Sequence, residues 1–474
     1  MNKKEIENIK KKILKKNKNC FDYLIKKDKS LIFSFAKEYK NFLDNSKTER
    51  EAVKEIIKLA KSEGFVDIDK VSENNSLKTK KFYKIFKEKS VGLAVLGKEP
   101  VQNGVNIIAS HIDSPRLDLK QNPFYEDIDL VLMKTHYYGG IKKYQWLNLP
   151  LALHGTIIKS DGKPIDITIG EDEDDPVFVI SDLLPHLAGK LQQNKKVADV
   201  FQGEKLNILC GSIPLGDEEL KDRFKLGVLN ILYEKYGIKE ENFVSAEIEV
   251  IPSNKARDIG FDRSMVGAYG QDDRICAFTG LKAISEIQAP FKTSVALFFD
   301  KEEIGSEGNT GAKSKFAEDF ILDLLFINKE DTDYRTLRKA LVQSQCLSAD
   351  VNAAMDPNFK EVHEKLNAAI LGAGVCITKY TGSRGKSGAS DANAEFINKI
   401  VSKFNKNKII WQTGELGKID EGGGGTLGKF LAETGMEVLD CGPALLSMHS
   451  PLEISSKADI FMTYKGYKAF FALD

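Results

Sequence analysis

Residues 294–308 read SVALFFDKEEIGSEG, and this stretch joins an apolar segment to a cluster of acids. The run SVALFF predicts a buried β-strand, because it is short, continuous and apolar. Asp300, Glu302 and Glu303 follow the run closely and lie at the predicted end of the strand. Adjacent glutamates usually belong to a solvated helix, but this pair comes directly after FFD and before IGSEG. We therefore expect a functional site at this strand end.

Four other motifs place histidine or acidic residues beside apolar runs, far apart in the sequence. They are SHIDSP (110–115), QDDR (271–274), SADVN (348–352) and SMHSP (447–451). In open α/β sheets, sites form at the carboxyl ends of the strands, so a folded sheet can bring such motifs together. Two histidines with several carboxylates are the ligands that a hydrolytic site with two metal ions needs.

The order of the predicted elements indicates the fold class. From about residue 257 onward, apolar strands such as SVALFFD and MEVLDCG alternate with helices such as RICAFTGLKAISEI. This alternation predicts an α/β sheet with helices on both faces. Between about residues 118 and 256, short β-like runs are broken by Gly, Pro and Asp clusters, which is typical of a β-rich segment. We interpret this segment as an insertion that separates the first metal motif from the others.

The composition argues against several classes of protein. The chain has 474 residues, 42% of them hydrophobic, and this length favours two domains. Basic and acidic residues number 69 each, and the resulting zero net charge argues against a nucleic-acid or anionic-membrane partner. No run approaches the roughly 18 apolar residues of a membrane span. Six widely spaced cysteines without a CxxC pair indicate reduced thiols and a cytoplasmic protein.

The candidate metal ligands offer imidazole nitrogen and carboxylate oxygen, the donors that zinc takes in catalytic sites. They are His111, Asp272, Glu303, Asp350 and His449. Two zinc ions about 3.5–4 Å apart need a bridging ligand, and a short carboxylate serves. With one shared carboxylate, each metal would have three protein ligands and room for a bridging water.

Two more acids fit supporting roles at such a centre. Asp113 follows His111 by two residues, and a carboxylate behind a ligand histidine fixes its tautomer and raises its basicity. Glu302 adjoins Glu303, so one glutamate can bind metal while its neighbour takes a proton from the activated water.

Together the motifs resemble those of the aspartyl aminopeptidase / aminopeptidase I family of dinuclear zinc exopeptidases. The resemblance rests on SHIDSPRLDLK, DKEEIGSEGNTGA, SADVNAAMDPNF and SMHSPLEI, and it covers nearly the whole chain. It implies a three-layer α/β/α catalytic domain with a mixed sheet, formed by residues 1–117 and 257–474. It also implies a β-rich dimerisation domain inserted at residues 118–256, and an enzyme that removes the N-terminal residue from peptides with a free N-terminus.

The resemblance assigns each ligand to one of two zinc ions per subunit. His111 and Asp350 would bind one ion, Glu303 and His449 would bind the other, and Asp272 would bridge them. Mn and Co tolerate the same ligands and are possible substitutes.

The resemblance also assigns the supporting residues. Glu302 would be the general base, and Asp113 would orient His111. The bridge is assigned to Asp272 with Asp273 as the alternative, because QDDR has two acids where the family form has a single Asp followed by Asn.

One motif lies within the β-rich segment. PHLAGK (185–190) resembles a family segment whose histidine reaches the active site of a neighbouring subunit and helps to hold the substrate carbonyl. His186 stands at that position, and its other interpretation is a surface histidine in a loop. The family assembly that follows is a homo-dodecamer built from dimers.

The preferred N-terminal residue stays open between acidic, basic and neutral. Residues 381–396, TGSRGKSGASDANAEF, resemble the family's pocket loop, where Lys386 or Arg384 could face an acidic side chain. Residues 414–426, GELGKIDEGGGGT, place Asp420 and Glu421 beside a glycine run, where they could favour a basic or neutral residue.

Two other functions compete with an aminopeptidase. The chain could be another dinuclear-zinc amidohydrolase, such as a deacylase or a carboxypeptidase, although the separate SMHSP motif and the long insertion argue against this. It could also be a catalytically inactive assembly scaffold, but every ligand position and the base position hold competent residues.

Overall fold

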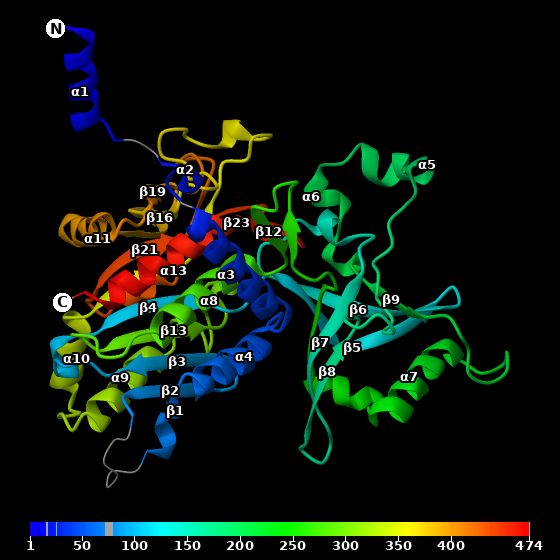
Figure 1. Cartoon of the computed structure of the whole chain (residues 1–474). Helices are drawn as coiled ribbons and strands as arrows, with labels where there is room; N and C mark the ends of the chain where they lie inside the picture. Colours follow the sequence, from blue (N-terminus) through cyan, green and yellow to red (C-terminus); the bar gives the residue numbers. More distant parts are fainter. Residues whose placement is uncertain (16–17, 25, 72–78, 474) are drawn as a thin grey trace.

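A mixed nine-stranded sheet forms the centre of the larger half of the molecule (Figure 1). The structure is a computed structural model that describes residues 1–15, 18–24, 26–71 and 79–473. The neighbouring strands β13, β4, β14 and β21 run parallel to one another, and antiparallel pairs occur on both sides of them. In spatial order the strands are β1 (Val66–Asp67), β2 (Lys81–Phe86), β3 (Ser90–Val95), β13 (Ser294–Phe299), β4 (Asn106–His111), β14 (Gln345–Ser348), β21 (Glu437–Gly442), β16 (Val375–Thr378) and β19 (Trp411–Thr413).

Helices cover both faces of this sheet, because its strands are apolar on both sides. On β13, Phe298 packs into one hydrophobic cluster and Leu297 into the other, as expected for side chains that alternate along a strand. The first cluster receives α3 (Lys26–Asp44), α4 (Glu49–Ser62), α8 (Gln271–Ser285), α11 (Ala394–Lys406) and α13 (Lys457–Phe471). The second receives α9 (Phe316–Ile327), α10 (Tyr334–Val342) and α12 (Gly428–Ala432). The predicted three-layer α/β/α fold with a mixed sheet is confirmed.

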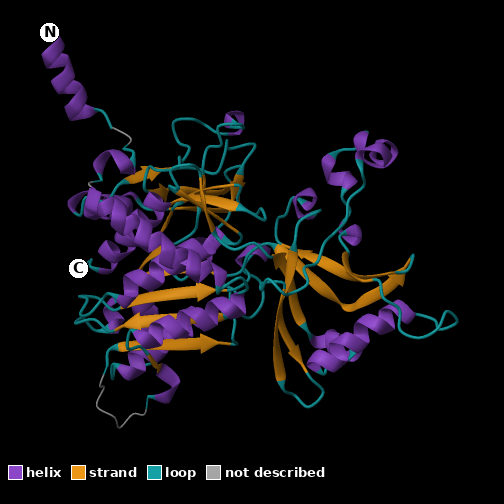
Figure 2. Ribbon diagram, turned by 45° about the vertical axis from the view of Figure 1, so that its right-hand side comes forward, coloured by secondary structure: helices purple, strands orange, loops and turns teal. Residues whose placement is uncertain are grey.

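A separate six-stranded antiparallel sheet lies beside this body and has a hydrophobic core of its own (Figure 2). Helix α7 (Arg223–Tyr236) packs on it through Phe224 and Leu232. The strands, in spatial order, are β8 (Pro164–Ile169), β7 (Leu151–Ile158), β10 (Glu247–Pro252), β5 (Arg116–Asp127), β6 (Leu130–Tyr138) and β9 (Ile208–Gly211). The strands of this sheet begin at Arg116 and end at Pro252, so they are formed almost entirely by the segment 118–256 that the sequence predicts to be β-rich.

Two smaller sheets and several short helices complete the fold. One sheet consists of β11 (Arg257–Ile259), β12 (Met265–Ala268), β23 (Glu453–Ser456), β22 (Ala444–Leu446) and β15 (Asn352–Ala353). The other consists of β18 (Ser387–Asp391), β17 (Tyr380–Ser383) and β20 (Gly423–Gly424). The remaining α-helices are α1 (Lys3–Ile13), which projects from the body in Figure 1, α2 (Cys20–Tyr23), α5 (Pro185–Ala188) and α6 (Val197–Val200).

All six cysteines are free thiols, and five of them are buried, which agrees with the prediction of reduced side chains. The cytoplasmic location stays a prediction. Within the described residues, no helix is both long enough and apolar enough to span a membrane.

Candidate metal centre and substrate cavity

The predicted ligands gather at one edge of the nine-stranded sheet. β4 ends at His111, which pairs with Phe299 at the end of the parallel strand β13. Asp350 follows the next parallel strand, β14, by two residues. Because parallel strands present their carboxyl ends at the same edge, three motifs that are distant in the sequence meet there. Asp272 comes from the start of α8 and His449 from the loop between β22 and β23.

The ligands form two clusters that share Asp272. In the first, His111 Nε2 lies 3.1 Å from Asp272 Oδ1 and 3.9 Å from Asp350 Oδ1. In the second, His449 Nε2 lies 3.3 Å from both Asp272 Oδ2 and Glu303 Oε2. Asp272 therefore directs one carboxylate oxygen into each cluster, as a bridging ligand would.

The neighbouring Asp273 points elsewhere. Its side chain is fully buried, and neither of its carboxylate oxygens has a hydrogen-bond partner. Among the described residues it belongs to neither of the two metal-sized clusters that contain Asp272. This geometry favours Asp272 over Asp273 as the bridge.

The tautomers of the two histidines indicate that a cation belongs between these groups. His449 Nδ1 is 3.0 Å from the carbonyl oxygen of Gly140, which can only accept, so Nδ1 carries a proton. His111 Nδ1 faces two acceptors of Asp113, the backbone oxygen at 3.1 Å and a carboxylate oxygen at 3.3 Å. Each Nε2 then carries a lone pair and faces only carboxylate oxygens. A metal ion between them would accept the lone pair of the imidazole and balance the charge of the carboxylates.

The acids of the centre show the same need for positive charge. Glu303 Oε1 is buried and has no hydrogen-bond partner, although a buried carboxylate oxygen normally has one. Burial and the nearby charge of Asp272 raise the pKa values of Glu303 and Asp350 well above the usual range. Nitrogen and oxygen donors in this number fit zinc.

Asp113 holds the turn that carries Glu302 and Glu303. Its carboxylate accepts the backbone N–H of Glu302 at 3.1 Å and that of Glu303 at 3.2 Å. It also accepts the hydroxyl of Tyr138 at 2.8 Å. The predicted role of Asp113, to orient His111, is compatible with these contacts, which extend to the predicted base Glu302 and the predicted ligand Glu303.

Glu453 is a supporting residue that the sequence reasoning missed. Its two carboxylate oxygens accept the backbone N–H of His449 at 2.8 Å and that of Asp272 at 3.1 Å. Glu453 is only 1% exposed, so it supports the backbone of His449 and Asp272 from the buried side of the centre. The one sequence signal for Glu453 was its position four residues after His449 in SMHSPLEI. Its partners are backbone N–H groups, which every residue type except proline has, so no residue pattern marks the contact.

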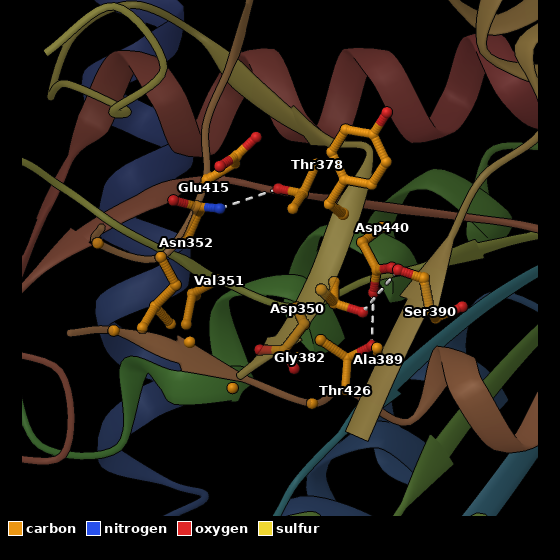
Figure 3. A pocket seen from close by; sticks show the side chains of 18 of the residues that line it. Asp350, Val351, Asn352, Thr378, Gly382, Ala389, Ser390, Glu415, Thr426 and Asp440 are labelled. Atoms are coloured by element: carbon orange, nitrogen blue, oxygen red, sulfur yellow. Dashed lines mark hydrogen bonds between the residues drawn. The ribbon is translucent and has the colours of Figure 1, made fainter. Parts of the chain in front are cut away.

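A cavity of about 860 Å³ opens onto the metal centre and is walled by the β17–β18 hairpin and residues 415–426 (Figure 3). Asp350 and Asp440 both face it in Figure 3. Thr426 Oγ1 donates to Asp440 at 2.6 Å, and burial raises the pKa of Asp440 to about 6. Glu302 also lines the cavity, and burial raises its pKa to about 7.

Of the residues predicted to bind the substrate side chain, only one lines the cavity. Arg384 lines the cavity, whereas Lys386, Asp420 and Glu421 are exposed and lie outside its lining. Lys386 stands at the tip of the β17–β18 turn, and Asp420 and Glu421 stand in the outer part of their loop. A loop sequence does not determine which of its charged residues faces inward, and here Glu415 is the acid of that loop that lines the cavity.

Comparison with known proteins identifies the family. The family model of the aminopeptidase I zinc metalloproteases (M18) matches residues 42–471. The chain belongs to this family. The probable M18 family aminopeptidase 1 of Clostridium acetobutylicum is 53% identical over 460 residues, which cover 97% of this chain and 98% of that protein.

Two solved structures show how far the likeness extends. The M18-family aminopeptidase from Thermotoga maritima matches with a TM-score of 0.92 at 46% identity, over 97% of this chain and 99% of that one. The mApe1 dodecamer of S. cerevisiae shares the fold, with a TM-score of 0.73 at 23% identity over 92% of this chain and 96% of that one. This M18 protein is accordingly a zinc metalloaminopeptidase, a hydrolase of peptide bonds, as the sequence predicted.

Removal of zinc is expected to destabilise the M18 fold, because the buried acids of the centre then repel one another without a cation. A ligand that binds only the folded state at 100 times its Kd stabilises it by about 2.7 kcal/mol. Calorimetry should show a lower unfolding temperature after chelation and recovery when zinc is added. The control is the double variant Asp350→Asn/His449→Ala, which should show no recovery with zinc. A full zinc response in that variant would mean that the stabilising metal binds elsewhere.

Proposed function

We propose that this aminopeptidase works with two zinc ions per subunit, held by the two clusters that share Asp272. The observation that carries the proposal is the division of one carboxylate, with Oδ1 at 3.1 Å from His111 Nε2 and Oδ2 at 3.3 Å from His449 Nε2. His111 and Asp350 complete one set of ligands, and Glu303 and His449 complete the other. Mn or Co could replace zinc, because both accept these donors.

Glu302 is the proposed general base. When bound, zinc supplies a Lewis acid that makes water a stronger acid near neutral pH. A carboxylate oxygen of Glu302 takes a proton from the attacking water and later gives it to the nitrogen that leaves. Glu302 lines the cavity, and burial raises its pKa to about 7, which suits a group that accepts and releases a proton near neutrality.

The acidic wall of the cavity explains the preference for a free N-terminus. Besides the metal ligands, Glu415 and Asp440 line the cavity. A protonated α-amino group would be attracted to these acids, and an acetylated one would lose both its charge and that attraction. An exopeptidase that acts on unblocked peptides follows from this arrangement, whereas a deacylase would need to accept the blocked group.

Glu302→Gln should reduce kcat by about 10²–10⁴-fold, since it removes a general base without changing the size of the side chain. The assay compares initial rates on unblocked and N-acetylated aminoacyl substrates, with zinc present. Glu307→Gln is the matched control, because Glu307 lies in the same loop with 65% of its side chain exposed. Retained activity in Glu302→Gln would remove the base assignment, and cleavage of acetylated substrates would favour a deacylase.

Arg384 is the cation proposed to influence the choice of N-terminal residue. Arg384→Ala should lower kcat/KM for an N-terminal Asp relative to Lys by about threefold to tenfold, a ~1 kcal/mol effect for an exposed charge. Lys386→Ala is the control, because Lys386 lies outside the cavity lining and should leave that ratio unchanged. If Lys386→Ala changes this kcat/KM ratio more than Arg384→Ala does, Lys386 rather than Arg384 determines the preference.

His186 is proposed to act on the active site of a neighbouring subunit. It lies on α5, which Figures 1 and 2 show well away from β4 and β13, so it cannot serve the centre of its own chain. We propose that residues 118–256 form the dimerisation domain and that the dimers assemble into a homo-dodecamer, the form in which the yeast relative was solved.

Co-expression of two defective chains tests the action of His186 across subunits. His186→Ala and Glu302→Gln should each be impaired alone, because each lacks one part of every active site. Mixed dimers regain one complete site, so random pairing should restore about a quarter of the wild-type rate. Equal rates in the mixture and in the separate variants would contradict the proposal. The single variants should keep wild-type mass in solution.

A further inference from the structure

The end of strand β6 brings the six-stranded sheet into contact with the metal centre of the same chain. We propose that Tyr138, Gly139 and Gly140, here called the YGG segment, are positioning residues that hold the two metal-binding histidines and the catalytic turn in register. This inference rests on the ligands and base proposed above. It assigns the six-stranded sheet a role in catalysis within its own subunit, in addition to the proposed dimerisation.

Tyr138 acts through Asp113. Its hydroxyl donates to Asp113 Oδ2 at 2.8 Å, and Asp113 is 0% exposed. The same carboxylate accepts the backbone N–H groups of Glu302 and Glu303 and lies 3.3 Å from His111 Nδ1. A displaced Asp113 would therefore move the proposed base and ligands of both zinc ions together.

Gly140 acts directly on the second histidine. Its carbonyl oxygen accepts the Nδ1 proton of His449 at 3.0 Å, which leaves Nε2 free to face Asp272 and Glu303. Hydrogen bonds of this kind set both the tautomer and the ring orientation of a ligand histidine. Between them, Tyr138 and Gly140 reach both histidines, one through Asp113 and one without an intermediary.

The close packing of the segment explains its two glycines. A Cβ on Gly139 would lie 3.3 Å from the Cβ of Glu303, and Gly139 has a φ of +73°. A Cβ on Gly140 would lie 3.3 Å from His449 Nδ1. Side chains at either position would press on a ligand, so the backbone approaches the centre as closely as it does only with glycine.

The six-stranded sheet holds the YGG segment in place. The guanidinium of Arg116, the residue paired with Tyr138 on β5, lies 4.0 Å from the centre of the Tyr138 ring. Arg116 Nε is 2.8 Å from Asp118 and 3.2 Å from Glu249, on β5 and β10. Its Nη1 is also 3.6 Å from Glu49 of α4, so the support spans both parts of the molecule. The position of the segment is thus supported by the ion pairs of the buried Arg116 side chain, and a shift of the sheet would reach the metal centre.

Tyr138→Phe in the full-length zinc-loaded enzyme tests the proposal, because it removes one hydroxyl and keeps the ring under Arg116. We expect kcat to fall about 10- to 100-fold, the usual effect of losing a partner behind a metal ligand. KM should change less than about threefold, since Tyr138 does not line the cavity. Zinc should also be lost faster to a chelator, while mass in solution and unfolding temperature stay close to wild type.

Tyr137→Phe is the matched control. Tyr137 is the preceding residue on β6, points to the other face of the strand and is 46% exposed, so its kcat and zinc loss should match wild type. A double-mutant cycle with Asp113→Asn then separates positioning from general packing. If Tyr138 acts through Asp113, Tyr138→Phe should have little further effect on kcat in the Asp113→Asn background.

The results can overturn the inference without touching the proposed function. A kcat within twofold of wild type in Tyr138→Phe, or effects of Tyr138→Phe and Asp113→Asn that multiply independently, would refute positioning while Glu302→Gln still abolishes turnover. Gly140→Ala provides a second variant if Tyr138→Phe fails to assemble, because its added Cβ presses on His449 alone. Wild-type kcat and zinc loss in Gly140→Ala would also overturn the proposal. Wild-type activity in Glu302→Gln would instead reject the proposed general base on which the inference rests.

Discussion

The repulsion between buried carboxylates is the constraint on which the rest of this structure depends. Asp272 has a ligand atom within 4.8 Å of one of Glu303 in one cluster and within 4.8 Å of one of Asp350 in the other, and at most 11% of any of the three side chains is exposed. Charges of one sign in such surroundings repel strongly, and they persist only with cations between them. The Nε2 atoms of His111 and His449 both face Asp272, which fits the zinc that this family uses. The protein must hold these groups in place by other means, and the surrounding structure supplies them.

Parallel strands and backbone hydrogen bonds provide that support. β4, β13 and β14 end at the same edge, which brings His111, the Glu302–Glu303 turn and Asp350 together. Asp113 holds the backbone N–H groups of the Glu302–Glu303 turn together with the Tyr138 hydroxyl, and Glu453 holds backbone N–H groups of two separate segments, at His449 and at Asp272. A backbone that is anchored in this way keeps the ligands close even while they repel one another, which is how an enzyme prepares its site before the substrate arrives.

Sequence reasoning could predict the candidate ligands because their signals are local. SVALFFDKEE and VNIIASHID each show an apolar strand followed at once by polar residues, and the position of a site at strand ends follows from the sheet. The helices on both faces follow from strands that are apolar throughout. Glu453, Tyr138 and Gly140 were missed because three of their four contacts here have a backbone atom on one side, and because these contacts join residues up to 309 positions apart.

The sequence by itself determined the α/β class and the family, and it predicted the candidate donor set and the β-rich segment, because strand patterns and motifs are written in neighbouring residues. Only the tertiary structure decided which of Asp272 and Asp273 faces both histidines, and that Arg384 rather than Lys386 lines the cavity. It also decided that strand β6 of the second sheet ends against the metal centre. The reason is physical: the direction of a side chain on a turn, and the partner of a backbone group, depend on packing between segments that the sequence leaves far apart.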